Sequence, residues 1–406
     1  MLEIVRPRFA GPRMVAVTVL VMTAAFGLNF GAGVFLAPLT AERGWGVGVL
    51  SAAATLSTLV GALLTPAIGL VLDRIGPRRV VTGSIALLAG SYLLLAVSDQ
   101  LWQFLLVYPL LGGAGFAGSA TLANSVLIGR WYRRARATML GRATLGITLG
   151  QVVVVPLAGL LVGRFGTTIA YLVLGAVVLV AVVPVAGLLL RDDPTELGQH
   201  PDGSPSAVPL DAAPDAAPAG VLARRQRWGV ASFGLHAFTL YAVVLHLPRH
   251  ATDLGGDSGT GATALALAAA VSGMTMLVGG PLADRHGHRP VLVTMHALRV
   301  LALLAAAIAT EPQPLFAMAV LFGLSSFPVI PVTTALLGAG RDPTALGGLL
   351  GRAWLVHQLA AGAGVLVAGL LRSATGDYRP WFLLAAAAAA AGLLLVLRLP
   401  TPWRKP

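Results

Sequence analysis

The chain is divided into long apolar runs, and this feature restricts its fold more than any other. Each run is about as long as the roughly 20 residues that a helix needs to cross a bilayer. Of the 406 residues, 56% are hydrophobic and only 11% are charged, whereas charged residues make up about a quarter of a soluble domain. Continuous runs predict helices rather than the alternating strands of a membrane barrel. We therefore expect an all-α integral membrane protein.

Twelve such runs occur in two sets of six. They cover residues 14–39, 47–72, 79–98, 103–128, 137–163 and 169–190, then 229–248, 261–283, 290–309, 315–338, 347–371 and 380–398. The segment between the sets is rich in Pro, Ala and Asp and has no apolar period, which predicts a disordered cytoplasmic linker. The expected domains are a six-helix bundle at 1–190, the linker at 191–228 and a second six-helix bundle at 229–406.

A short charged loop occurs once in each set of runs. The sequence GLVLDRIGPRR at 69–79 is followed 211 residues later by GPLADRHGHR at 280–289. The shared pattern consists of glycines, one acid and several bases: Gly69, Asp73, Arg74, Gly76 and Arg78 in the first copy, and Gly280, Asp284, Arg285 and Gly287 in the second. Leu140, Gly141 and Arg142 likewise match Leu350, Gly351 and Arg352. A duplicated unit predicts two pseudo-symmetric bundles.

Basic residues are concentrated on one side of the predicted membrane. The chain has a net charge of +12, and most of its arginines precede the first run or lie between runs on that same side. The positive-inside rule then places both termini in the cytoplasm. We expect a multi-pass protein of the inner (plasma) membrane, with topology rather than ligand binding as the role of most of these arginines.

The inventory of side chains excludes several kinds of site. Cysteine is absent, so thiol catalysis and thiolate metal sites are excluded. The histidines are widely spaced and lack acidic partners, so we expect no metal site. No nucleophile, base and orienting group can be assembled within the membrane, and no phosphate-binding loop is present, so we expect neither an enzyme nor a cofactor. The expected partners are a small-molecule substrate and the bilayer, with a proton left open; we expect no nucleic acid and a monomeric functional unit.

The pattern G-x-x-x-D-R-x-G-x-R resembles the signature loop of the major facilitator superfamily of secondary transporters. Within that superfamily the chain is similar to bacterial relatives of the monocarboxylate porters. The residues that carry this resemblance are FGAGVFLAPL at 30–39, Glu42, Gly44, Trp45, Ser51, the Gly-Pro-Arg-Arg of the first loop, RWYRR at 130–134, and His246, Leu247 and Pro248. The resemblance implies transport of small organic anions, often with a proton, by alternating access.

One position departs from that resemblance. Porters of this kind typically carry an Arg in the eighth span, four residues before the glycine that opens the second loop. Met276 occupies the position here, and its thioether cannot hold a carboxylate. An anionic substrate would then need Arg142, Arg352 or a protonated His; otherwise the substrate is neutral or hydrophobic.

No acidic residue lies in the middle of a predicted span, whereas three arginines lie within spans: Arg142, Arg299 and Arg352. A buried Arg costs about 2.5 kcal/mol or more and needs a partner. We expect crossed latches that hold the cytoplasmic side shut, Asp73 with the helix start at Arg352 and Asp284 with the helix start at Arg142. Direct contact of these arginines with substrate is the alternative. For Arg299 we expect no ligand role and find no partner.

The substrate cavity is expected to take polar and aromatic residues near mid-span, chiefly from spans one, four, seven and ten, which line the cavity in the superfamily. The candidates are Asn29, Phe30, Tyr108, Asn124, Thr148, Gln151, His236, Tyr241, His246, Met276, Ser325, His357 and Gln358. Any one of them alone could equally serve helix packing. The favoured function is transport of a small organic anion. Export of a neutral or hydrophobic compound is the second hypothesis, and a transporter-like sensor that does not translocate is the third.

Overall fold

The computed structural model describes residues 9–205, 218–256 and 258–399, and every regular element within these ranges is a helix. The first half consists of α1 (Gly11–Gly31), η1 (Ala32–Phe35), α2 (Leu36–Arg43), α3 (Val47–Ile75), α4 (Pro77–Ala96), α5 (Leu101–Leu106), η2 (Val107–Gly112), α6 (Gly113–Ser119), α7 (Thr121–Trp131), α8 (Arg136–Leu149), η3 (Gly150–Val154), α9 (Val155–Val177), η4 (Val178–Val182) and α10 (Val183–Leu189). After η5 (Pro194–Leu197) and η6 (Pro201–Gly203), the second half consists of α11 (Ala219–Asp253), α12 (Ser258–His286), α13 (His288–Ile308), α14 (Pro314–Leu324), α15 (Val329–Gly338), η7 (Pro343–Ala345), α16 (Leu346–Thr375) and α17 (Arg379–Leu397).

Eleven helical stretches in the described ranges are long and apolar enough to cross a membrane. One of them, Arg136–Leu189, has 54 residues, which at about 1.5 Å per residue is far longer than a bilayer core of about 30 Å. Its backbone turns at Gly166, where φ is 78° and ψ is 173°, a conformation that glycine adopts without strain. The stretch therefore crosses twice. The expected fold class, twelve transmembrane helices in two pseudo-symmetric six-helix bundles, is confirmed.

Two spans are interrupted at corresponding places in the two bundles. The fourth span breaks between α6 and α7 at Ala120, whose φ and ψ are −79° and −151°. The Asn124 amide donates hydrogen bonds of 2.7 and 2.8 Å to the carbonyl oxygens of Ser119 and Ala120. The tenth span breaks between α14 and α15. Such breaks persist within a membrane only where side chains satisfy the freed backbone groups, and Asn124 does so here.

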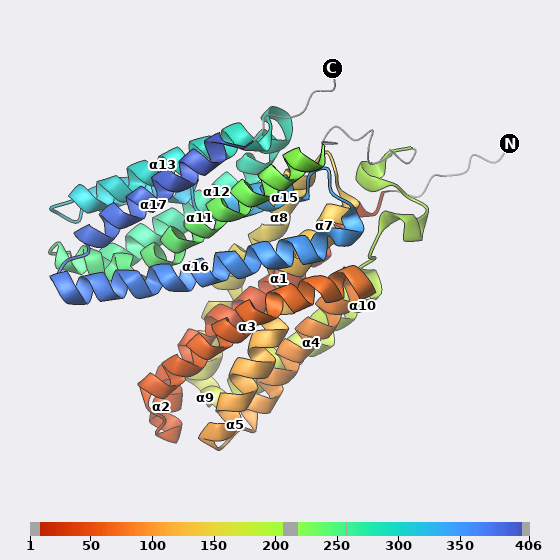
Figure 1. The fold of residues 1–406 in the computed structure, drawn as a ribbon. Coiled ribbons are helices and arrows are strands. Elements are labelled where there is room, and N and C mark those ends of the chain that lie inside the picture. Colours follow the sequence, from red (N-terminus) through yellow and green to blue (C-terminus); the bar gives the residue numbers. More distant parts are fainter. Residues whose placement is uncertain (1–8, 206–217, 257, 400–406) are drawn as a thin grey trace.

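The bundles are joined at the end where the chain termini lie and diverge toward the other end (Figure 1). The space around the glycines of α12 and α16 shows the same divergence. A Cβ added at Gly280 would lie 2.5 Å from the carbonyl oxygen of Ala137, whereas Gly273, two turns away on the same face of α12, has nothing within 4 Å. Gly351 on α16 would meet the Thr65 carbonyl oxygen at 2.7 Å, and Gly362 again meets nothing. The helices therefore touch at one end only.

The outer surface is strongly apolar. Leu63, Val180 and Ile308 are 67%, 75% and 75% exposed, which would be unfavourable in water. Lipid covers such side chains in a membrane, and the driving force for packing the helices together comes from close contact and hydrogen bonds instead.

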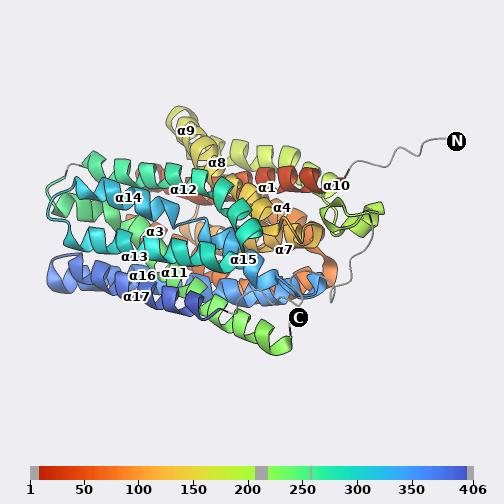
Figure 2. The same ribbon diagram turned by 90° about the horizontal axis from the view of Figure 1, so that it is seen from above.

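The segment between the bundles differs from the disordered linker expected over 191–228. Residues 191–205 fold into the short turns η5 and η6 against the first bundle, at the end that carries the termini (Figures 1 and 2). The Asp202 carboxylate accepts hydrogen bonds of 3.0 Å from the N–H groups of Arg133 and Arg134, and residues 219–228 are already helical in α11. Composition predicted neither the turns nor the early start of α11, because a few side-chain hydrogen bonds stabilise the turns and the segment has no apolar period. Residues 206–217 lie outside the described residues.

Candidate functional site

The two bundles are in contact near one end, through α3, α7 and α8 of the first and α12, α15 and α16 of the second, and two parts of this contact are here called the seam. It consists of residues 65–73 of α3 against residues 347–351 of α16, and of residues 137–144 of α8 against residues 276–284 of α12. Gly69 and Gly347 face each other so closely that a Cβ on either would overlap the carbonyl oxygen of the other. Gly141 and Gly280 play the same part in the second contact. Small residues are therefore required for the closed seam.

One carboxylate from each bundle caps a helix of the other bundle. Asp73 accepts hydrogen bonds of 2.7 Å from the N–H groups of both Gly347 and Gly348, at the start of α16. Asp284 accepts from the N–H of Ala137 at 3.1 Å and from the N–H and hydroxyl of Thr138 at 2.8 and 2.6 Å, at the start of α8. The first N–H groups of a helix have no partner within it, and the helix dipole favours a negative charge there. These are the two helix starts at which the sequence analysis places the carboxylates.

The remaining residues of the duplicated loop shape the turn and its support. Gly76 and Gly287 adopt φ values of 85° and 91°, which glycine adopts without strain. Arg78 donates from Nε and Nη2 to the Gly187 carbonyl oxygen, at 2.9 and 2.5 Å. Arg289 repeats this bond 211 residues later, donating to the Leu397 carbonyl oxygen at 2.6 Å. Arg74 and Arg285 are exposed.

Asp192 ties this loop to the segment that follows the first bundle. Its carboxylate accepts a hydrogen bond of 2.6 Å from the N–H of Arg78. Burial raises the pKa of the Asp192 carboxyl, while the Arg78 hydrogen bond acts in the opposite direction. The start of α4 thus has its own carboxylate cap, from within the same bundle.

Arg142 and Arg352 take no part in these contacts. Neither guanidinium makes a hydrogen bond or ion pair within the described residues. Arg142 shares an exposed face of α8 with Leu149, which is 42% exposed, and Arg352 shares one of α16 with Val356 and Leu359, which are 40% and 49% exposed. Such apolar faces suit lipid. The placement favours a topological role over substrate contact.

Met276 lies in the seam rather than in a cavity. It is 1% exposed, its backbone carbonyl faces Gly141, and its sulfur lies 3.2 Å from the Thr144 hydroxyl. The expectation that Met276 lines the cavity is therefore wrong for this conformation, because α12 turns this side chain toward α8.

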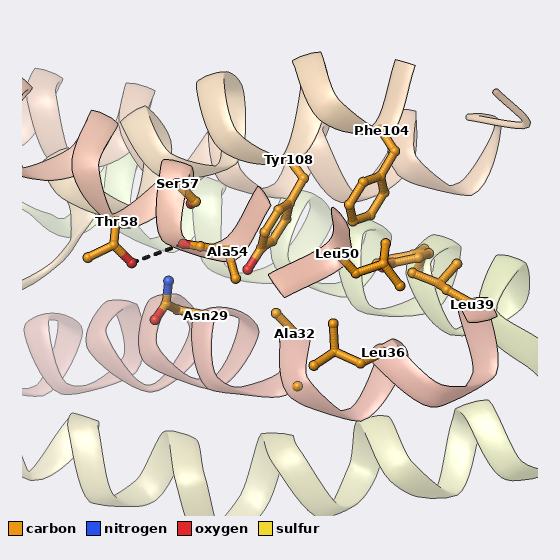
Figure 3. A pocket seen from close by; sticks show the side chains of 12 residues that line it. Asn29, Ala32, Leu36, Leu39, Leu50, Ala54, Ser57, Thr58, Phe104 and Tyr108 are labelled. Atoms are coloured by element: carbon orange, nitrogen blue, oxygen red, sulfur yellow. Dashed lines mark hydrogen bonds between the residues drawn. The ribbon is translucent and has the colours of Figure 1, made fainter. Parts of the chain in front are cut away.

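A pocket of about 170 Å³ opens inside the first bundle, in the half where the bundles have diverged. Its lining comes from α1, α2, α3 and α5 with η1, η2 and α9: Asn29, Ala32, Gly33, Leu36, Leu39, Leu50, Ala54, Ser57, Thr58, Phe104, Tyr108 and Tyr171. Figure 3 shows the Asn29 amide pointing across to α3 and the Tyr108 hydroxyl pointing into the same space. Two cavity candidates, Asn29 and Tyr108, are therefore brought together.

The pocket has hydrogen-bonding groups but no charged side chain in its lining. Asn29 and Tyr108 make no hydrogen bond within the described residues, so their polar atoms are available to a ligand. Thr58 donates to the Ala54 carbonyl oxygen at 3.1 Å. The Tyr108 ring stacks on Phe104 with centroids 5.4 Å apart. Because drug-sized ligands occupy roughly 300 Å³ or more, this volume suits a smaller solute.

The other cavity candidates lie elsewhere. Phe30 packs on Phe26, with ring centroids 5.7 Å apart, and His246 contacts the Tyr378 hydroxyl at 3.0 Å near the end of α11. Thr148, Gln151 and Gln358 are half-buried on α8, η3 and α16. His236, Tyr241, Ser325 and His357 belong to the second bundle, and His236 and Ser325 lie beside Arg299, as described below. No three His, Asp or Glu side chains in the described ranges are placed to hold a metal ion.

Several site residues were missed by sequence reasoning. Ser57, Thr58 and Tyr171 line the pocket but carry no signal in a sequence where hydroxyls commonly stabilise helix packing. Arg299 was noticed, yet its partners were not. The signal was an arginine in the middle of a span, which requires polar groups on neighbouring helices. A single sequence does not show which polar groups these are.

Known proteins similar to this chain are transporters. The model of the Major Facilitator Superfamily matches residues 17–280 and 234–406. Monocarboxylate transporter 11 of Homo sapiens is 30% identical over 352 residues, which covers 80% of this chain and 69% of that protein. Monocarboxylate transporter 13 of Bos taurus is 27% identical over 389 residues, covering 92% of this chain and 86% of that protein.

Solved structures of the same fold cover almost the whole chain. The transporter FucP in the outward conformation superposes with a TM-score of 0.73 at 15% identity, covering 97% of this chain and 100% of that one. The human organic anion transporter MFSD10 superposes with a TM-score of 0.73 at 17% identity, covering 96% of this chain and 100% of that one. The expected resemblance is confirmed. With the family model matching most of the sequence, the chain belongs to the major facilitator superfamily of transporters.

Proposed function

We propose that the chain moves a small organic anion of the monocarboxylate class across the membrane by alternating access. The observation that carries the mechanism is the reciprocal capping of α16 by Asp73 and of α8 by Asp284. Each carboxylate belongs to one bundle and its partner to the other, so both contacts must break before the seam can open. The seam is then a gate, and the bundles are the two moving parts.

The orientation follows from charge. Arg74 and Arg285 directly follow the two seam carboxylates, and Arg134 lies in the turn before α8, whose start Asp284 caps. The start of α1 and the end of α17 lie at the same end (Figure 1), and the positive-inside rule assigns that end to the cytoplasm. We therefore infer an inner (plasma) membrane protein with both termini cytoplasmic, here in an outward-facing state with the cytoplasmic gate shut. The bundles at 1–190 and 229–406 are proposed to move as units within a monomer.

The substrate class rests on the relatives and on the charge inside the membrane. The two relatives described above are named monocarboxylate transporters. Within the described spans, no carboxylate lies in the interior, whereas Arg299 is fully buried. A positive interior attracts anions and repels cations. The net effect favours an anionic solute.

A neutral or hydrophobic solute is the second candidate, and one observation favours it. The pocket at Asn29 and Tyr108 has no charged side chain in its lining, and the position at which the porters carry an Arg is Met276, which is buried in the seam. A neutral solute would need only the amide and hydroxyl groups of the pocket.

Exchange in proteoliposomes separates the two candidates. Vesicles loaded with unlabelled L-lactate are diluted into labelled L-lactate, with lactamide, its neutral isostere, as the matched competitor. An anion porter accumulates label at least several-fold above empty liposomes, lactate competes and lactamide does not. Absence of lactate exchange together with exchange of labelled lactamide would favour the neutral candidate and contradict the proposal.

A further inference from the structure

Three buried histidines from three helices lie together in the second bundle, and two of them, His236 and His296, line the same small space as the buried Arg299. His236 on α11, His296 on α13 and His357 on α16 are 4%, 3% and 0% exposed, and Arg299 on α13 is 2% exposed. The ring centroid of His236 lies 6.4 Å from that of His296 and 6.1 Å from that of His357. Four groups that can carry positive charge are thus gathered in the interior of one bundle. We call them the histidine cluster and its arginine.

The charge of Arg299 is met only by neutral groups. Its Nε donates to the Ser325 hydroxyl at 3.1 Å, and its Nη1 to the Thr239 hydroxyl at 3.0 Å. Nη2 donates to the Ser325 carbonyl oxygen and, at 3.3 Å, to the Ser326 hydroxyl. The guanidinium also lies 4.5 Å above the centre of the Phe322 ring. No ion pair in the described ranges includes Arg299, so a full positive charge stays uncompensated inside the bundle.

The cluster holds unused proton-binding capacity. Nε2 of His236 and both ring nitrogens of His357 have no hydrogen-bond partner within the described residues. By contrast, both ring nitrogens of His246 are engaged, at 3.0 Å with the Tyr378 hydroxyl and at 3.2 Å with the Val365 carbonyl oxygen. Buried polar atoms normally find partners, so orphaned ones call for a functional explanation. Histidine is also the side chain whose charge ordinarily changes between pH 5 and 8.

The groups facing the cluster are few. From α11 come His236 and Tyr241, whose ring lies 6.1 Å from that of His357; α13 adds His296 and Arg299; and α16 adds His357. The break between α14 and α15 adds Ser325, α15 adds Val329 and α17 adds Ala389, all uncharged. The space between His236, His296 and Arg299 admits no water-sized sphere. It is therefore closed to a substrate molecule in this conformation.

We propose that His236 and His357 form the proton-binding site of this transporter, and that Arg299 couples the proton to the charge of the substrate. This rests on the proposed function, because the coupling needs an anionic substrate. Without an anion, Arg299 disfavours a second positive charge beside it. An anion between the bundles offsets that charge, so the proton binds more tightly, and by linkage the proton tightens anion binding by the same factor. The two histidines exchange their proton with water only in other states of the cycle, taking it up from the outer side and releasing it to the inner side, and no other reactant is needed.

Trp354 provides a direct reporter of this proton. Its ring lies 4.8 Å from that of His357, and a protonated imidazole quenches the fluorescence of an adjacent indole. In purified protein we expect emission to fall in one step as pH is lowered from 8 to 4.5 with 100 mM sodium L-lactate present. With sodium chloride instead, the midpoint should lie lower by about one pH unit or more. The step should be missing in Trp354→Phe, which identifies the reporter.

Variants test each part of the proposal. His357→Gln should lose the step, His236→Gln should shift its midpoint, and the matched control His246→Gln should leave it unchanged. Arg299→Gln should raise the midpoint in chloride and abolish its dependence on lactate. A step that survives in His357→Gln, or a wild-type protein without a step in lactate, overturns the proton site. If His357→Gln fails to fold, the comparison of wild type with Trp354→Phe decides the same question.

Transport assays separate this proposal from the proposed function. His236→Gln and His357→Gln should exchange labelled lactate with a raised apparent KM, because the proton no longer tightens anion binding, and an inward pH gradient should no longer accelerate their uptake. Full acceleration by the gradient in both variants contradicts the proton site and leaves anion transport intact. Absence of lactate exchange in the wild type contradicts the proposed function, whatever the fluorescence shows.

Discussion

Asp73 and Asp284 each hold a helix start of the opposite bundle, so the charge of a single side chain sets how firmly the seam is closed. A carboxylate at a helix start is stabilised by the dipole by about 0.3–2 kcal/mol, depending on burial. Both aspartates are half-buried, and the two capped helices are related by the internal repeat. The loss of one charge should therefore weaken the seam without unfolding a bundle.

Replacing Asp73 by Asn keeps an acceptor but removes the charge. We expect slower transport with little change in substrate binding, and a seam that opens more often, by about 2- to 30-fold in population. Thr65 is 3% exposed in the seam and the chain has no cysteine, so a single Cys at Thr65 can be labelled without background, and its labelling should accelerate in Asp73→Asn. Unaltered turnover and labelling would refute the gate role of Asp73.

Asp342 supports the same helix start and predicts a pH dependence of stability. Its Oδ1 accepts from the N–H and hydroxyl of Thr344 at 2.9 and 2.8 Å, and these bonds lower the pKa of the Asp342 carboxyl. A carboxyl whose pKa is lower in the folded than in the unfolded chain stabilises the fold at pH values above its unfolded pKa, near 3.9. That stabilisation is lost as the pH falls through the pKa of the folded state. Asp342→Ala should cost about 1 kcal/mol at pH 7. The difference in melting temperature between Asp342→Ala and wild type should be the same at pH 7 and pH 5 and should shrink at pH 3.5. A difference that stays constant down to pH 3.5 would show that the shape of the turn matters rather than the charge of Asp342.

The Tyr108 hydroxyl tests the pocket of the first bundle. It makes no hydrogen bond within the described residues, so Tyr108→Phe should leave the melting temperature unchanged. If a substrate occupies this pocket, loss of one hydrogen bond should raise the apparent KM of exchange by about 2- to 12-fold, equivalent to about 0.5–1.5 kcal/mol. A fall in melting temperature with unchanged KM would place the hydroxyl in structure instead.

For single residues, the sequence predicted positions correctly where the contacts of the side chain follow from its own segment and the internal repeat. The carboxylates Asp73 and Asp284 were placed at their helix starts because the internal repeat relates the two acids and the two helix starts, and because the helix dipole favours a carboxylate there. Asn29 and Tyr108 were selected as uncharged polar residues on inner spans. The partners of Arg299 could not be found, because Thr239 and Ser325 come from two other helices whose rotation a single sequence does not give. The same lack of rotation misplaced Met276.

At the scale of elements, the helices follow from apolar runs and from glycine turns, and most of their ends lie within a few residues of the expected bounds. The π-helical segments η2, η3 and η4 and the break at Ala120 leave no pattern in hydropathy, since they change hydrogen bonding without changing which residues are apolar. For the proposed function, the helices of the two bundles must approach one another closely at one end and separate at the other. Glycine makes that approach possible.

Gly280→Leu tests the close approach, with Gly273→Leu as its control on the same face of α12. A side chain at Gly280 would overlap the backbone at Ala137, whereas Gly273 has open space around it. Overpacking costs about 1–3 kcal/mol, so Gly280→Leu should hold the seam open and slow exchange about tenfold or more. Gly273→Leu should exchange at nearly the wild-type rate. Equal loss of exchange in both variants would point to general damage to α12 rather than to the seam.

At the scale of the whole molecule, the two-bundle plan was predictable from sequence because the duplication fixes both the number of helices and their symmetry. The conformation was not, since the same residues form the closed and open arrangements, and only contacts such as Asp73 with Gly347 distinguish them. The segment 191–205 adds a docked support on the first bundle, through Asp192 and Asp202. The first bundle and this support are therefore expected to move together.

The central claim is that the bundles rock between an outward-open and an inward-open state, and a pair of distances tests it most directly. Spin labels at Ser51→Cys and Ser373→Cys report the outer end, and labels at Ile75→Cys and Ala345→Cys report the end with the seam; all four positions are exposed. The account predicts two populations for each pair, with added lactate or Asp73→Asn shortening the outer distance as it lengthens the inner one. Distances that stay single and unchanged, or that lengthen together, would contradict alternating access.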